Sequence, residues 1–153
     1  MKRCVQCGHE TLRPDEAEDA VTVAGRTFSR MVPVLRCEKC GETYFRGPEL
    51  QAVELEAAGV IAREGPSDGA TFKFMRKALG LRAVELAELL NVAPETLSRW
   101  EHAQRPVDRA SWIALSAMVL DKLEGRTATL DRLRALLKPG PLPKLVHLVP
   151  RAA

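Results

Sequence analysis

The chain has 153 residues, 46% of them hydrophobic and 28% charged, which fits one ordinary globular domain or two small ones and excludes wholesale disorder. No apolar run approaches the roughly 18 residues of a transmembrane helix, and the first cysteine follows Met1 too closely for a signal peptide. We therefore expect no membrane association and a reducing, cytoplasmic location. The net charge of +3 is uneven: residues 1–65 carry 9 Lys/Arg and 11 Asp/Glu, whereas residues 66–153 carry 14 and 9. A basic half is typical of proteins that meet a polyanion, although chance scatter of solvated charges explains the asymmetry equally well.

All four cysteines fall into two copies of one motif, C-x-x-C-G, formed by Cys4 with Cys7 and by Cys37 with Cys40. Glycine after each pair can adopt positive φ, so the chain can turn tightly and aim backbone N–H groups at the sulfurs. The spacing predicts one structural Zn²⁺ per chain, held by four thiolates with no open position for chemistry. Four ordinary buried cysteines or two disulfides are the alternatives. A redox-active pair is disfavoured, because a second pair is present and no thioredoxin-like strand and helix surround the first.

The segment between the cysteine pairs predicts a small sheet. Residues 11–19 are acidic and contain a proline, which indicates a loop. Residues 20–23 and 26–35 are rich in β-branched side chains and predict a hairpin, with Pro33 at a sheet edge or at the end of its strand. A helix is expected from Gly47-Pro48, because apolar residues then recur at helical spacing. So short a segment buries little, and zinc is expected to replace a hydrophobic core.

The remaining chain predicts helices. Two glycines and a proline in residues 64–69 indicate a linker. Helices are then expected over residues 71–79, 82–90, 94–103, 109–123 and 127–137, with Asp108 capping the fourth. The predicted fold is a two-domain α+β protein. It has a zinc-stapled β-hairpin domain (1–64), a linker (65–69), an all-α five-helix helix-turn-helix domain (70–138) and a tail (139–153).

The second and third of these helices have the pattern of a helix-turn-helix. Leu86 belongs to an apolar stripe on the first helix of the pair, Val92 fills the turn, and Leu97 anchors the next helix. With these side chains facing inward, Glu95 and Arg99 face outward, with Thr96 beside them. Their spacing would let them reach base edges along one face of a helix in the major groove.

This segment, which ends in Ser98-Arg99-Trp100-Glu101, resembles the Cro/C1-type (XRE) helix-turn-helix. Its combination with two C-x-x-C-G motifs resembles the YgiT/MqsA-type zinc-finger antitoxins over residues 1–138. The resemblance implies that the zinc domain binds a ribonuclease toxin, and that the helical domain dimerises and represses its own operon. The implied partners are double-stranded DNA with a palindromic operator, a protein toxin and a second copy of the chain.

The resemblance also assigns roles to residues. The four cysteines match the zinc ligands, and Arg99 matches a base-reading arginine. Glu95 stands where the antitoxins carry a base-reading asparagine, which changes the expected operator, because glutamate accepts from cytosine whereas asparagine prefers adenine. Ala93 replaces the usual Ser or Thr cap. Arg82 opens the preceding helix and is expected at a phosphate, while Trp100 is expected in the core. The candidate DNA-binding residues are Arg82, Glu95, Thr96, Ser98, Arg99 and Arg105.

No catalytic grouping is present, so we expect no enzyme. Two other functions remain open: a stand-alone repressor without a toxin, and a protein-interaction module with vestigial DNA binding. Lysines and arginines outside the candidate set, such as Arg76, are expected to lie on solvated faces. The last two helices carry more apolar residues than one small domain can cover, which predicts a homodimer. These residues are Trp112, Met118, Val119, Leu133 and Leu136.

Overall fold

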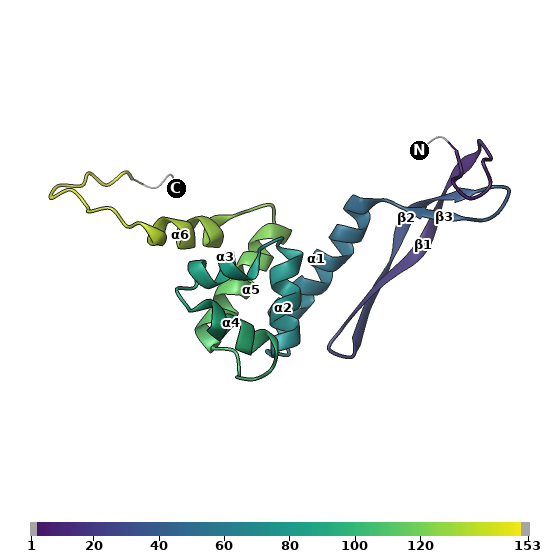
Figure 1. Ribbon diagram of the computed structural model, residues 1–153. Helices are drawn as coiled ribbons and strands as arrows, with labels where there is room; N and C mark the ends of the chain where they lie inside the picture. Colours follow the sequence, from purple (N-terminus) through teal and green to yellow (C-terminus); the bar gives the residue numbers. More distant parts are fainter. Residues whose placement is uncertain (1–2, 151–153) are drawn as a thin grey trace.

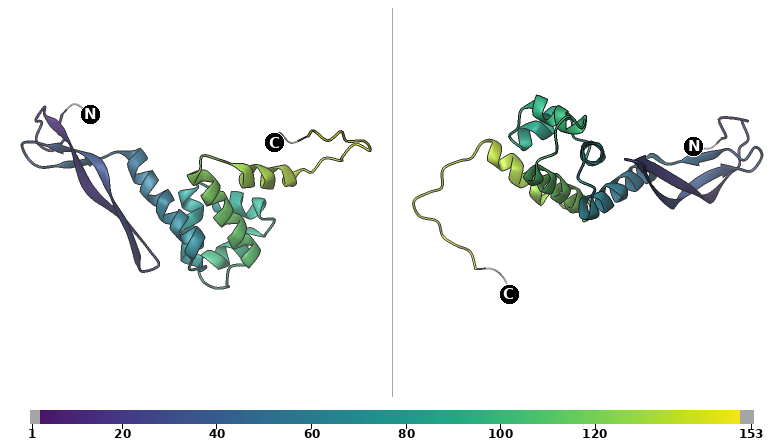
Figure 2. Two further views of the ribbon diagram at one scale, coloured as in Figure 1. Left: turned by 180° about the vertical axis from the view of Figure 1, so that it is seen from behind. Right: turned by 90° about the horizontal axis from the view of Figure 1, so that it is seen from below.

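A three-stranded antiparallel sheet precedes six helices in the computed structural model, which describes residues 3–150. The long helix α1 (Gly47–Glu64) joins the sheet to the other helices, and the C-terminal segment extends from their far side (Figures 1 and 2). The predicted α+β class, with a cysteine-containing hairpin followed by helices, is confirmed. No helix in the described part of the chain is long and apolar enough to cross a membrane.

The sheet is built on a hairpin of β1 (Leu12–Val23) and β2 (Arg26–Cys37), and β3 (Thr43–Phe45) pairs with the end of β2. The hairpin turn consists of Ala24 (φ 50°) and Gly25 (φ 75°). Two consecutive residues with positive φ form the turn whose twist matches that of the flanking strands. The predicted hairpin is therefore confirmed, and β3 is an addition that the sequence pattern did not indicate.

The prediction of a loop over residues 11–19 was wrong, because β1 begins at Leu12. Two prolines are compatible with the ladder: Pro14 pairs with Leu35, and Pro33 pairs with Glu16. Counted from the turn, both pairs fall at non-hydrogen-bonded positions of an antiparallel ladder, so the missing N–H of each proline faces away from its partner strand. Pro33 also does not end its strand. It lies one residue before the part of β2 that pairs with β3.

Helix α1 packs against the sheet with one part and against the helices with another. Proline stands in its first turn, as expected. Its Val53 packs with Val32 and Val34 of β2, and Arg30 of β2 forms ion pairs with α1 carboxylates. Further along α1, the buried Ile61 belongs to the core of the helical part. A single helix therefore contributes to both hydrophobic clusters.

The helical part consists of α2 (Gly69–Ala78), α3 (Ala83–Leu89), α4 (Pro94–Glu101), α5 (Arg109–Leu123) and α6 (Ala128–Leu137). All five predicted helices are present, with ends displaced by at most about two residues, within the ordinary uncertainty of helix boundaries. The Asp108 side chain accepts a hydrogen bond of 2.9 Å from the Ser111 N–H, which confirms the predicted cap of α5. The buried core contains Phe72, Met75, Leu86, Leu97, Trp100, Leu115, Met118 and Val119.

The tip of the hairpin also reaches this core. Val23 is buried there, with Val21 and Phe28 packed beside it. The division into residues 1–64, 65–69 and 70–138 stays a prediction, as does the tail at 139–153, of which residues 151–153 lie outside the described part. The segment between α1 and α2 is short, and contacts on both sides of it connect the sheet and the helices.

Two expectations about individual side chains were wrong. Met118 and Val119 are 3% and 0% exposed within their own chain, so they are not part of an uncovered apolar surface. Arg76 is 8% exposed rather than solvated, because it forms an ion pair inside the helical part. Half of the large apolar residues that remain exposed in the described part of the chain lie at the C-terminal end.

Candidate metal centre and nucleic-acid interface

The four cysteines converge at the end of the sheet that lies far from the helices. Their Sγ atoms all lie within 4.8 Å of one another. Cys4 and Cys40 are 3.5 Å apart, and Cys7 and Cys37 are 3.6 Å apart. A tetrahedral ion with metal–sulfur bonds of ~2.3 Å has sulfur–sulfur edges of about 3.8 Å. The cluster therefore has the dimensions of a four-thiolate metal site, and it could hold one metal ion.

The backbone repeats the same turn at both cysteine pairs. Gly8 N–H donates to the Cys4 carbonyl at 2.9 Å, and Gly41 N–H donates to the Cys37 carbonyl at 3.0 Å. These glycines have φ of 69° and 76°, as the sequence predicted. Backbone N–H groups also point at sulfurs, including that of Cys7 toward Cys4. The turns are thus arranged to stabilise thiolate sulfur.

Tyr44 is a contact of the metal cluster that sequence reasoning missed. Its hydroxyl lies 3.1 Å from Cys4 Sγ and accepts a hydrogen bond of 2.9 Å from the Val5 N–H. The hydrogen bond between the Tyr44 hydroxyl and the Cys4 sulfur is the main cause that lowers the pKa of the Cys4 thiol to about 6. The hydrogen bond from the Glu42 N–H lowers the pKa of the Cys40 thiol. Desolvation and the neighbouring thiols outweigh this hydrogen bond and raise the pKa to about 12. Four thiolates so close together need a cation between them, and this donor set fits a metal ion.

Helices α3 and α4 form the second candidate site, and the turn between them has a defined geometry. Asn91 adopts φ 54°, and Val92 N–H donates to the Ala87 carbonyl at 3.0 Å. This is a Schellman-type end to α3, with asparagine at the left-handed position that it tolerates well. Ala93 follows as the cap of α4 and supplies no side-chain hydrogen bond, as expected. The turn fixes the angle at which α4 leaves α3.

The structure places the predicted contact residues of α4 on its surface. Glu95, Ser98 and Arg99 are exposed and Thr96 is half-buried, while Leu97 and Trp100 point into the core. The face opposite the core is therefore free to meet a duplex. The predicted core position of Trp100 is confirmed: it is 4% exposed and its ring stands edge-on to Phe72, with 5.8 Å between ring centroids.

The other two candidates flank this face in sequence. Arg82 is the cap residue of α3, and its side chain is 80% exposed. Glu85 accepts hydrogen bonds from the Arg82 N–H at 2.7 Å and from its guanidinium at 3.2 Å, and these bonds hold the pKa of Glu85 below its usual value. Arg105 is exposed in the loop after α4, where its N–H donates to the Arg99 carbonyl. No described contact buries either guanidinium.

A buried ion pair fixes α4 against α2. Arg76 of α2 donates to both carboxylate oxygens of Glu101, at 2.6 and 2.9 Å, and to the Leu81 carbonyl at 2.8 Å. The two charged side chains are 9% and 5% exposed. Gly69 permits the close approach of the same two helices, because a Cβ there would overlap the Trp100 carbonyl oxygen. These residues position the exposed face of α4 without taking part in it.

Comparison with known proteins agrees with this geometry. Residues 72–118 match the family model described as helix-turn-helix, which covers α3 and α4 with most of α2 and α5. No curated protein and no solved structure gives a significant match to the chain. The family match confirms the expected Cro/C1-type helix-turn-helix, and it supports a sequence-specific DNA-binding regulator. The matched residues include every predicted DNA contact.

Proposed function

We propose that this chain is an antitoxin that represses its own operon and neutralises a ribonuclease toxin through its cysteine-containing sheet, which holds one Zn²⁺. It acts as a homodimer on a palindromic operator. The observation that carries the proposal is that one chain has two exposed surfaces suited to binding, and that helix α1 connects the parts on which they lie. The four-cysteine sheet lies at one end, and the exposed face of α4 lies in the helical part.

Zinc is the metal that the four-thiolate donor set favours, and its role is structural. The metal–thiolate bonds at such a site contribute roughly 10–16 kcal/mol. We expect one Zn²⁺ per chain by elemental analysis. The variant Cys37→Ser should lose the metal and the fold of the cysteine-containing end of the sheet, while the helical part keeps its circular dichroism. Stoichiometric absence of metal, or a disulfide between the pairs, contradicts this assignment.

On DNA, α4 enters the major groove and Arg99 reads a base edge. Glu95 contributes a second contact on the same face. Contacts to the DNA backbone or to neighbouring bases come from Arg82, Thr96, Ser98 and Arg105. The support is that Glu95, Ser98 and Arg99 are exposed on a helix that the core holds in place, with Thr96 half-buried beside them. Arg82 before α3 and Arg105 after α4 are exposed as well. A bidentate arginine contact contributes about 1–3 kcal/mol of discrimination.

Selection on randomised duplexes tests this interface. Arg99→Ala should lose specific binding by about 1–3 kcal/mol per half-site. Arg82→Ala is the matched control, since loss of a phosphate contact weakens all sequences alike and flattens the salt dependence. Glu95→Gln should shift the preference from cytosine toward adenine at one position. If Arg99→Ala and Glu95→Gln both leave affinity and preference unchanged, α4 does not enter the groove.

The sheet offers a surface for a basic partner. β1 is an edge strand, with its outer edge unpaired in the described part of the chain. Glu16 and Glu18 are exposed on it, and they form no ion pair within the described residues. An open strand edge with free carboxylates suits a cationic protein, because backbone groups and charge both attract it. Ribonucleases that bind a polyanion are commonly basic.

Co-expression tests the toxin assignment. The open reading frame beside this gene should arrest growth when expressed alone, and this chain should relieve the arrest and co-purify with its product. Glu16→Lys/Glu18→Lys should weaken relief, whereas the control Thr22→Lys on the same strand should not. If the neighbouring product is harmless and does not bind, the chain is a stand-alone repressor. Loss of DNA binding with retained toxin binding would favour an interaction module.

A further inference from the structure

The C-terminal arm, defined as α6 together with residues 139–150, carries apolar side chains that its own chain does not cover. α6 has no buried residue, and residues 139–150 are exposed and form neither helix nor strand. Seven aliphatic side chains of the arm are between 42% and 89% exposed: Leu136, Leu137, Leu142, Leu145, Val146, Leu148 and Val149. So dense an apolar segment is uncommon on the surface of a monomer.

After α6 the arm first leads away from the helical core and then bends back, as the views in Figures 1 and 2 show. Prolines at positions 139, 141 and 143 favour extended backbone just after α6, because proline fixes φ and disfavours helix in the residue before it. The stretch 144–149 is then free of proline, and four of its six residues are Leu or Val. The arm thus presents an extended aliphatic segment at a distance from its own core.

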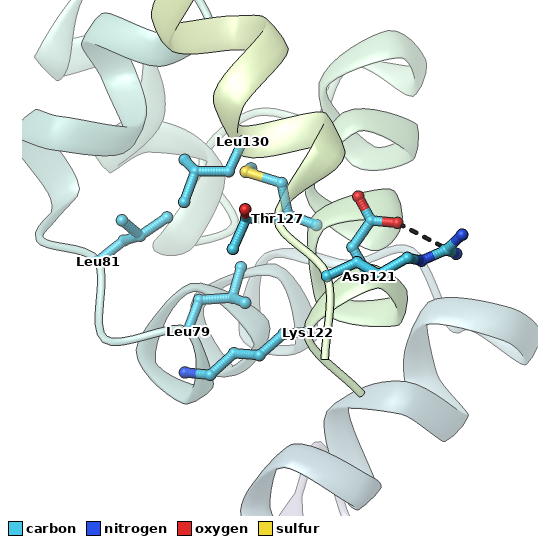
Figure 3. Close-up of a pocket in the computed structure, with 8 residues that line it drawn as sticks. Leu79, Leu81, Asp121, Lys122, Thr127 and Leu130 are labelled. Atoms are coloured by element: carbon cyan, nitrogen blue, oxygen red, sulfur yellow. Dashed lines mark ion pairs between the residues drawn. The ribbon is translucent and has the colours of Figure 1, made fainter. Parts of the chain in front are cut away.

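Each chain also has an apolar pocket of about 240 Å³ at the opposite end of α6. Leu79, Leu81, Met118 and Leu130 line it, and the labelled leucines converge on a common space in Figure 3. The ion pair of Asp121 with Arg126, at 3.5 Å, lies at its rim. The lining suits aliphatic side chains from an added segment, because it offers few polar partners.

The tail of the same chain is poorly placed to fill this pocket. The pocket adjoins the first residues of α6, whereas the tail leaves from the last, about 15 Å away for a helix of 10 residues. The tail does bend back after α6 (Figure 1), yet its aliphatic side chains remain exposed, so within its own chain it leaves the pocket uncovered. The arm of a second copy can approach the pocket from outside.

We propose that the arm packs against a second copy of this chain, so that the tail of each copy covers α6 and the pocket of the other. This inference rests on the homodimer of the proposed function and identifies the surface that forms it. One two-fold contact would cover the tail and the pocket of both copies, which is the commonest form of a soluble oligomer. At roughly 100 Å² per fully buried aliphatic side chain, the exposed residues supply on the order of 500 Å² per copy. Two copies then reach the ~1,000 Å² that a specific interface needs.

Light scattering of the full chain in the absence of DNA tests the inference. We expect a mass of about twice 16.9 kDa at a protein concentration of roughly 50 μM, which is well above the dissociation constants of stable dimers. Leu145→Asn/Leu148→Asn should raise the dimer dissociation constant by roughly 1000-fold or more, because each substituted side chain occurs twice in the dimer. Lys144→Asn, in the same segment, is the control and should remain dimeric. A chain ending at Lys138 should be monomeric and still unfold cooperatively, since it loses no side chain buried within its own chain, and its melting temperature should no longer depend on protein concentration.

The outcomes separate the inference from the function on which it rests. A dimer that persists in the double variant and in the shortened chain would overturn the role of the arm and leave the homodimer standing. A full-length chain that is monomeric at this concentration would overturn both. Because the measurement contains no DNA and no toxin, failure of either of those proposed activities would not affect it.

Discussion

The ion pair between Arg76 and Glu101 provides a demanding test of how α4 is held. The guanidinium makes three hydrogen bonds, two to the carboxylate of Glu101 and one to the Leu81 carbonyl, and both charged side chains are less than one tenth exposed. Removing one partner leaves the other charge buried without compensation, which costs about 3–5 kcal/mol. That is a large fraction of the roughly 5–15 kcal/mol that stabilises a typical domain.

We expect Glu101→Gln and Arg76→Met each to lower the free energy of unfolding by about 3–5 kcal/mol, measured by urea denaturation. The double variant Arg76→Met/Glu101→Gln should lose less than either single variant, because no buried charge remains. It should still lose ~1–3 kcal/mol, because the Leu81 carbonyl no longer has its donor. Any effect on DNA affinity should follow the loss of folded protein, since neither side chain lies on the exposed face of α4.

The double-mutant cycle tests whether the charges of Arg76 and Glu101 interact. If the double variant loses the sum of the two single losses, the two charges act independently and the ion pair does not hold α4. If Glu101→Gln costs less than about 1 kcal/mol, the pair behaves like one at the protein surface and its burial has no energetic consequence.

Three further predictions follow from local geometry. Gly69→Ala should destabilise the helical part by about 1–3 kcal/mol or more, because the added methyl overlaps the backbone of α4; an unchanged melting temperature would show that the helices separate easily. The hydrogen bond from the first turn of α5 holds the pKa of Asp108 below 3.8, so its contribution to stability is present above about pH 3.8 and is lost as the pH falls through the lower folded-state value. Asp108→Asn should therefore lose less stability than the wild type between pH 5 and pH 2, and identical losses would contradict the assignment. Tyr44→Phe should weaken metal binding about 10–100-fold in competition with a chelator, whereas Phe45→Leu should not; equal affinities would mean that the hydroxyl does not support the thiolate.

The parts of this fold that follow from local pattern were predictable from sequence. The hairpin turn, the positions of the helices and the turn behind each C-x-x-C-G motif are each determined by a few neighbouring residues, and all three agree with the structure. The inward position of Trp100 and the cap at Asp108 follow from helical periodicity and from capping chemistry in the same way. Their physical causes are contained in windows of about ten residues.

The features that sequence reasoning missed depend on residues far apart in the chain. The acidic segment before residue 20 is a strand because it pairs along its length with β2, where Asp15 also forms an ion pair of 2.5 Å with Arg36, and no local pattern indicates that partner. The burial of Arg76 likewise requires Glu101, 25 positions away. Tyr44 meets Cys4 only when β3 closes the sheet. In each case the decisive interaction is between elements, which composition and periodicity do not describe.

Helix α1 gives the molecule a fixed internal length. Its 18 residues span about 27 Å, with the sheet packed against one part and the helical core against another. Because the hairpin tip also touches that core, the sheet has a set orientation as well as a set distance from α4. A protein bound to the sheet would therefore have a fixed orientation relative to a duplex bound to α4. One residue inserted into α1 would rotate the segment before the insertion by about 100° relative to the segment after it and move the two apart by about 1.5 Å. The effect of a protein on the sheet upon a duplex on α4 would therefore depend on the length of α1 and on the size and position of that protein, rather than on the flexibility of a linker.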